Sequence, residues 1–166
     1  MIGSFGMKIL RLFLCCISYI CLVATMLTAF GFSAQEGEKS DSVSKKVVSI
    51  VTGKSVDEIN KLEQERKDDQ VTVNGIIRKC AHFSLYLLMG IFAYLSLIFT
   101  FGKKDSLLIA AALAICLLYA SSDEIHQYFS GGRTAAASDV LLDFSGSAIG
   151  IFLIYKLKEI FFGVSY

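Results

Sequence analysis

Four long apolar stretches, separated by shorter polar segments, dominate the pattern of hydrophobic and polar positions along the chain. They cover residues 10–33, 76–101, 106–124 and 138–158. Each is close to the ~20 residues that a helix needs to cross the hydrocarbon core of a bilayer. The chain has no proline that would break a helix. The pattern therefore predicts an all-α membrane protein, a single domain over residues 1–166, whose four transmembrane helices form an up-down bundle.

The first apolar stretch admits a second interpretation, because basic residues followed by an apolar run are also typical of a signal peptide. Lys8 and Arg11 stand at its start. However, the run is long for a signal peptide. The best cleavage position, after Ala34, would also place the bulky Phe32 where a small residue is required. We therefore expect a retained first span, with cleavage as the alternative.

Residues 35–75 form a polar, densely charged segment between the first two spans. Val47 and Ile50 belong to a short run of apolar residues at helical spacing, which indicates an amphipathic helix on a membrane or protein surface, or a plain spacer. Basic residues in short flanks mark the cytoplasmic side of a membrane protein. With four spans, the flank before the first span, the turn between the second and third spans and the flank after the fourth span share one side, and all three are basic. We therefore expect both termini in the cytoplasm and residues 35–75 outside. These flanking residues are Lys8, Arg11, Lys103, Lys104, Lys156 and Lys158.

Composition supports lipid as a partner and excludes several other classes. Hydrophobic residues make up 54% of the chain and charged residues 19%, compared with about 25% charged residues in soluble domains. The formal net charge of +1 provides no basic surface for nucleic acid. The five cysteines lie in apolar stretches without CxxC spacing, so they predict neither a disulfide framework nor a zinc site. We expect no cofactor and no metal.

Polar residues enter the apolar pattern at the start of the second span. Lys79, His82 and Tyr86 lie at positions i, i+3 and i+7, so they share one face of a helix. Arg78 lies one turn before His82. Ionisable residues inside a membrane span are costly and usually serve a function. These four residues are therefore candidate functional residues.

A second polar group follows the third span. Gln127 lies three residues after Glu124 and four after Asp123, so either pair places a polar patch at the outer end of that helix. A Gly-Gly turn and then Arg133 come next. Arg133 is the obvious partner for the carboxylates of this end, with Arg78 as a further one.

The fourth span begins with two aspartates above two glycines. Asp139, Asp143, Gly146 and Gly150 form one stripe at i, i+4, i+7 and i+11. Glycines on a transmembrane helix allow another helix backbone to approach closely. In an up-down bundle the start of the second span, the end of the third and the start of the fourth lie at the same level. We therefore expect both polar groups and these aspartates to meet at the outer end, with Lys79 as another cationic partner.

These residues resemble the signature of the VanZ-like membrane proteins over about residues 74–155. The matching pattern is Arg78-Lys79-x-x-His82-Phe83-x-x-Tyr86, then Asp123-Glu124-x-x-Gln127, Gly132-Arg133, Asp139, Gly146 and Gly150. The resemblance implies a bacterial plasma-membrane protein of a family associated with lowered susceptibility to glycopeptide antibiotics such as teicoplanin. It also implies that His82, Glu124, Gln127, Arg133 and Asp139 form the polar signature. Asp143 departs from the family pattern, which more often has asparagine there.

Several functions remain open at this point. The first is binding of a cell-envelope component, such as a cell-wall precursor, or of a glycopeptide antibiotic at the outward polar residues. The second is a membrane enzyme for a lipid-linked or peptidoglycan-related substrate. It would use His82 and Glu124 as an acid-base pair, or hold a metal with His82, His126 and carboxylates. A polar collar that only clamps helix ends is the structural alternative. No inverted repeat is visible, which argues against autonomous transport. A partner subunit, or self-association through the Gly146 and Gly150 face, also remains open.

Overall fold

The computed structural model describes residues 4–33, 45–50, 52–65, 73–102, 105–131 and 136–162, and all secondary structure in these ranges is helical. The helices are α1 (Ser4–Ser33), α3 (Val56–Glu65), α4 (Val73–Phe101), α5 (Asp105–Gly131) and α6 (Ala137–Phe162), with a further helical stretch at 45–50. The predicted all-α class is confirmed.

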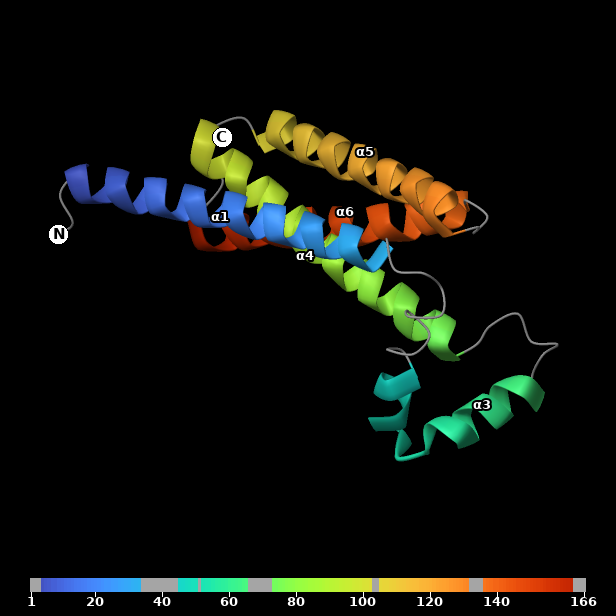
Figure 1. Cartoon of the computed structure of the whole chain (residues 1–166). Coiled ribbons are helices and arrows are strands. Elements are labelled where there is room, and N and C mark those ends of the chain that lie inside the picture. Colours follow the sequence, from blue (N-terminus) through green and yellow to red (C-terminus); the bar gives the residue numbers. More distant parts are fainter. Residues whose placement is uncertain are drawn as a thin grey trace.

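Four of these helices, α1, α4, α5 and α6, are long and apolar enough to cross a membrane. Successive long helices run in opposite directions, which gives the predicted up-down bundle (Figure 1). The lipid-facing surfaces are rich in large apolar side chains. On α1, for example, Leu12, Ile20 and Leu27 are each about two-thirds exposed, as expected where lipid rather than water surrounds the helix.

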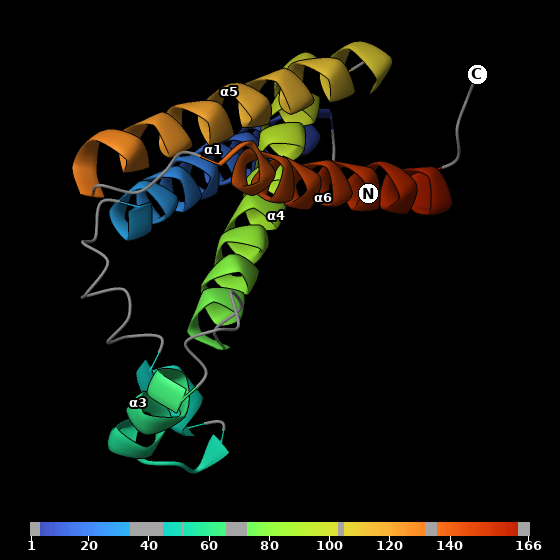
Figure 2. The same cartoon turned by 90° about the vertical axis from the view of Figure 1, so that its right-hand side faces the viewer.

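Helix α4 is the centre of the bundle, because it packs against α1, α5 and α6. Figure 2 shows that α4 crosses the other three long helices obliquely. Glycines make the contact with α6 exceptionally close. A Cβ atom at Gly90 would lie 2.2 Å from the carbonyl oxygen of Ser147, and one at Gly150 would lie 2.2 Å from the carbonyl oxygen of Leu87. The glycine stripe of α6 thus packs within the bundle, against the backbone of α4.

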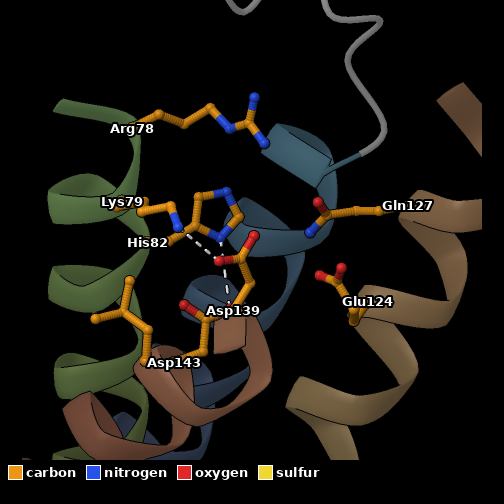
Figure 3. A pocket seen from close by; sticks show the side chains of 8 residues that line it. Arg78, Lys79, His82, Glu124, Gln127, Asp139 and Asp143 are labelled. Carbon is orange, nitrogen blue, oxygen red and sulfur yellow. Dashed lines mark hydrogen bonds and ion pairs between the residues drawn. The ribbon is translucent and has the colours of Figure 1, made fainter. Parts of the chain in front are cut away.

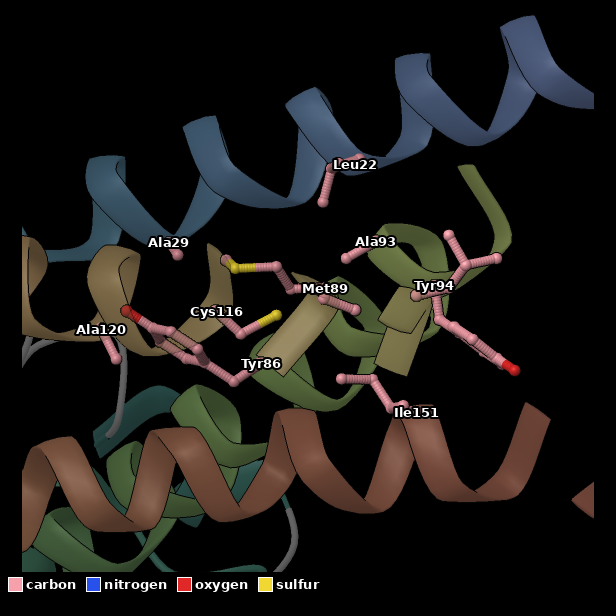
Figure 4. Close-up of a cluster of buried hydrophobic side chains, with 11 residues drawn as sticks. Leu22, Ala29, Tyr86, Met89, Ala93, Tyr94, Cys116, Ala120 and Ile151 are labelled. Carbon is pink, nitrogen blue, oxygen red and sulfur yellow. The ribbon is translucent and has the colours of Figure 1, made fainter. Parts of the chain in front are cut away.

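The core lies between the four helices (Figure 4). Tyr86, Met89 and Ile151 are among its fully or almost fully buried side chains. Helix α1 contributes Leu22 and Ala29 to the same cluster. The hydroxyl of Tyr119 in α5 also donates a hydrogen bond to the carbonyl of Met26 in α1, at 2.6 Å. These contacts make α1 part of the bundle core, and its retention as a span stays a prediction.

One end of the bundle is closed by paired polar groups. The Arg11 guanidinium donates hydrogen bonds to the carbonyls of Phe99 and Thr100, at 2.7 and 3.1 Å, and so satisfies carbonyls left open at the end of α4. Lys158 of α6 forms an ion pair with Asp105 at the start of α5. The hydroxyl of Tyr94 donates to the same carboxylate. We call these four side chains, Arg11, Tyr94, Asp105 and Lys158, the paired end.

Part of the polar segment between α1 and α4 is helical. Within 45–50, Val47 and Ile50 of the predicted apolar run are 40% and 83% exposed, whereas the adjacent Val48 is buried, so a surface role for this helix stays a prediction. Helix α3 begins with a capping box: Glu58 donates its backbone N–H to the Ser55 hydroxyl, and Ser55 donates its backbone N–H to the Glu58 carboxylate. The rest of residues 35–75 lies largely outside the described residues, and the side of the membrane it occupies stays a prediction.

Candidate functional site

The start of α4, the end of α5 and the start of α6 meet at the end of the bundle opposite the paired end (Figure 3). They enclose a cavity of about 140 Å³, called the polar cavity below. Apart from Leu142, every residue that lines it is polar and was singled out in the sequence. The lining residues are Arg78, Lys79, His82, Glu124, Gln127, Asp139, Leu142 and Asp143.

Two predicted site residues that the structure describes, Tyr86 and Asp123, do not line the cavity. Tyr86 and Asp123 lie behind its wall, with exposed fractions of 0% and 2%. The Tyr86 hydroxyl donates a hydrogen bond to Asp123 Oδ2 at 3.2 Å. Arg133 lies outside the described residues, so its pairing with the carboxylates of this end stays a prediction. Asp123 is therefore the deepest acidic group of the site, held between α4 and α5.

Asp123 also links the site to α1. The hydroxyl of Ser33, the last residue of α1, donates to Asp123 Oδ2 at 2.6 Å. The Gln127 amide donates to the same oxygen at 3.4 Å and to the Ser33 hydroxyl at 3.1 Å. The other carboxylate oxygen, Oδ1, is buried and has no hydrogen-bond partner among the described residues. Sequence reasoning missed Ser33, whose only signal is a hydroxyl at the C-terminal end of the first span.

Two carboxylates at the cavity have clear structural partners. Lys79 pairs with Asp139 at 2.8 Å, where both side chains are partly exposed, so one of the predicted cationic partners is confirmed. Glu124 Oε1 accepts the backbone N–H of Ala136 at 2.8 Å. Ala136 directly precedes α6, and a carboxylate there is stabilised by the free N–H groups and the dipole of the helix. Glu124 therefore ties the end of α5 to the start of α6.

His82 faces Asp143 rather than Glu124. Its Nδ1 atom lies 3.7 Å from Asp143 Oδ2, and both side chains are largely buried. No hydrogen bond or ion pair joins His82 to Glu124 in the described part of the chain. The acid-base pair of the enzyme alternative, His82 with Glu124, is therefore not assembled in this geometry. A proton carried by His82 would have Asp143 as its nearest acceptor.

Among the described residues, those that could hold a metal include only one of the two histidines named in the metal alternative, together with carboxylates. His126 stacks on Phe30 of α1, with ring centroids 4.4 Å apart and an angle of 22° between the rings. His82 instead lies with two aspartates: one potential ligand atom each from His82, Asp123 and Asp143 falls within 4.8 Å of the others. His126 instead lies on the face of α5 that packs on α1, so the geometry of the described residues groups His82 with the two aspartates rather than with His126.

Comparison with known proteins adds one match. A family model described as VanZ/LLP1 matches residues 15–161. This stretch runs from the middle of α1 almost to the end of α6 and includes every residue around the polar cavity. No match was found among curated proteins or among solved structures.

Proposed function

The chain belongs to the VanZ/LLP1 family, and from this premise we propose that it binds a charged group of a cell-envelope component, or of a lipophilic glycopeptide of the teicoplanin type, at the polar cavity. Binding there lowers susceptibility to the antibiotic. The observation that carries the proposal is the meeting of charged side chains from three spans around one cavity. A collar that only clamped helix ends would have no need of a cavity.

The cavity supports a ligand that carries charges of both signs. Arg78 and Lys79 offer cations on its wall, while Glu124, Asp139 and Asp143 offer carboxylates. A carboxylate at the bilayer centre costs about 2.5–3.5 kcal/mol, and such groups are retained where a partner or a polar cavity receives them. Peptide-bearing ligands of either proposed class present carboxylates to the cations and amino groups to the aspartates.

The size of the cavity limits what enters it. Pockets that enclose a small molecule usually measure about 300–1,000 Å³, whereas this cavity measures about 140 Å³. Only a terminal charged group of a larger ligand fits inside. The remainder of the ligand would lie along the membrane surface, which suits an amphiphilic molecule already held in the bilayer.

The proposed orientation places the cavity outside a bacterial plasma membrane and both termini in the cytoplasm. The basic short flanks support this orientation. Arg11 and Lys158 both lie at the paired end, and Lys103 and Lys104 follow the end of α4 closely in sequence. The cavity end would then face the cell wall and any antibiotic that reaches it.

Susceptibility to teicoplanin tests the proposal. The wild type and the variants Glu124→Gln, Arg133→Ala and Asp139→Asn are produced at equal levels in a susceptible bacterium, beside an empty vector. We expect the wild type to raise the minimum inhibitory concentration at least about fourfold, and the three variants to lose most of that rise. Glu159→Gln is the matched control, because Glu159 pairs with Tyr155 and Lys156 on its own helix, far from the cavity.

Two outcomes would contradict the proposal. The first is equal susceptibility of the wild type and the empty vector. The second is a protective effect that all three cavity variants keep in full. Immunoblots of membrane fractions ensure that a lost effect reflects the cavity and not a lost protein.

A further inference from the structure

We infer that His82, Asp123 and Asp143 form a binding site for a divalent transition-metal ion, with Zn²⁺ the best fit, at the inner end of the polar cavity. The inference concerns a ligand set that neither the antibiotic proposal nor the family match requires. It also replaces the expectation from the sequence that the chain holds no metal.

The spacing of the three residues suits one ion. His82 Nδ1 and Asp143 Oδ2 lie 3.7 Å apart, and two metal bonds of about 2.0–2.2 Å that meet at one ion span such a gap. An Asp123 oxygen completes a trio within 4.8 Å, which small carboxylate rotations can close. Figure 3 shows the His82 ring and the Asp143 carboxylate turned toward one another at the cavity.

Asp123 provides independent support for a missing partner. The residue is 2% exposed, and its Oδ1 atom is buried without a hydrogen-bond partner among the described residues. Buried polar atoms are almost always satisfied, so an unsatisfied carboxylate oxygen suggests a water or ion that protein atoms alone do not supply. A metal ion bound through this oxygen would supply the missing interaction.

The other oxygen of Asp123 has the surroundings of a metal ligand held from behind. Ser33, Tyr86 and Gln127 all donate to Oδ2. Such donors fix the orientation of a ligating carboxylate and leave its second oxygen free for the ion. These donors come from α1, α4 and α5, and the ligand Asp143 comes from α6. A metal ion at this site would therefore connect all four spans.

The charges at this depth also favour a cation. Asp123 and Asp143 are both buried. Lys79, which lines the cavity, forms its ion pair with Asp139 and not with either of these two carboxylates. Two carboxylates in a poorly solvated site need a compensating positive charge. One imidazole and two carboxylates form a mixed nitrogen and oxygen set that suits Zn²⁺ better than Mg²⁺. Because His82 and Asp143 also line the cavity, an ion there would keep positions open for water or an anionic ligand.

Metal binding by the purified full-length protein tests the inference. The protein carries a tag without histidine, is stripped with a chelator in detergent, and is dialysed against buffered Zn²⁺, Mn²⁺ or Mg²⁺ before elemental analysis. We expect about one Zn²⁺ per chain and much weaker binding of Mg²⁺. Asp143→Asn and His82→Gln should each weaken Zn²⁺ binding at least about tenfold.

Asp139→Asn is the matched control for Asp143→Asn, because both residues line the cavity but only Asp143 belongs to the trio. It should leave Zn²⁺ affinity within about twofold of the wild type. Tyr86→Phe removes only a donor to Asp123 and should weaken binding about tenfold, in the range seen when a group behind a ligand is lost.

A second measurement covers trio variants that do not fold, as judged by size-exclusion chromatography and circular dichroism. Co²⁺ bound to the wild type reports its ligands through visible absorption. A spectrum of a nitrogen- and oxygen-ligated ion supports the site, and no visible absorption overturns it.

Substoichiometric Zn²⁺ in the wild type, or stoichiometric Zn²⁺ that both Asp143→Asn and His82→Gln retain, would overturn the inference. So would an equal loss in Asp139→Asn, which would indicate diffuse attraction to an acidic surface. The assay contains no antibiotic and no envelope component. Its outcome therefore stands apart from the susceptibility test, and either proposal can fail without the other.

Discussion

The two ends of this helix bundle use charged residues in different ways. At the paired end, Asp105 meets Lys158, and Arg11 meets the open carbonyls of α4. At the cavity end, among the described residues, only Asp139 of four carboxylates pairs with a lysine. Asp123 and Glu124 accept hydrogen bonds from neutral donors, and Asp143 faces His82. Charges at the first end close the bundle, whereas charges at the second surround a space that something else can enter.

The close contact between α4 and α6 holds the cavity end together. A substitution that forces these two helices apart should therefore cause the largest loss of stability. Gly150→Ala would place a Cβ atom 2.2 Å from the Leu87 carbonyl oxygen. The two backbones must then separate, which we expect to lower the free energy of unfolding by about 2–3 kcal/mol, as for overpacked cores. Thermal unfolding in detergent, followed by circular dichroism, measures this loss.

Gly31→Ala is the matched control, because a Cβ atom there meets nothing within 4 Å and Gly31 lies in a helix. It should be neutral, or stabilising by up to about 1 kcal/mol, since alanine favours the helix more than glycine does. Equal destabilisation by both substitutions would show that the close approach of α4 and α6 is not what holds this part of the bundle.

The Asp123 network should give the next largest effect. Ser33→Ala removes the shortest hydrogen bond to Asp123 and leaves a buried carboxylate with fewer donors. Hydrogen bonds to charged groups contribute about 1.5–3 kcal/mol, so we expect a loss in this range in the same unfolding assay.

Ser84→Ala is the control for Ser33→Ala. The Ser84 hydroxyl is exposed and donates to the Cys80 carbonyl of its own helix, so its removal should change stability by less than about 0.5 kcal/mol. A Ser33→Ala protein as stable as Ser84→Ala would contradict the role given to the network.

Hydropathy and alternation of direction were sufficient to predict the general architecture and the level at which the polar residues meet. The four apolar runs are long, and an up-down order places His82, Glu124 and Asp139 at one end whatever the details of packing. The Lys79–Asp139 pair could be predicted in the same way. Both residues lie in the first turns of their spans, and these turns lie at the same end of the bundle.

The exact partners could not be predicted, because they depend on how the helices rotate and cross. Gly90 and Gly150 let α4 cross α6 at backbone contact, and this approach decides that His82 meets Asp143 and not Glu124. His126 illustrates the same limit. One alternative from the sequence had it share a metal with His82, but the rotation of α5 turns it onto Phe30. The part played by Ser33 required knowing which face of α1 packs on α5, and a nearly uniform apolar span does not reveal that.

The substitutions with the smallest expected effect on stability test whether the two ends differ in function. Lys158→Met at the paired end and Lys79→Met at the cavity end each remove one partner of a partly exposed ion pair. Such pairs contribute about 0–1 kcal/mol, so both variants should unfold close to the wild type. Because Lys79 lines the polar cavity and Lys158 does not, only Lys79→Met should reduce protection against teicoplanin, by about half or more. The same substitution at two lysines with similar pairing thus tests the position of the charge rather than its loss. If Lys158→Met reduced protection as much as Lys79→Met, the cavity would have no special part in it, and the two ends would differ in geometry alone.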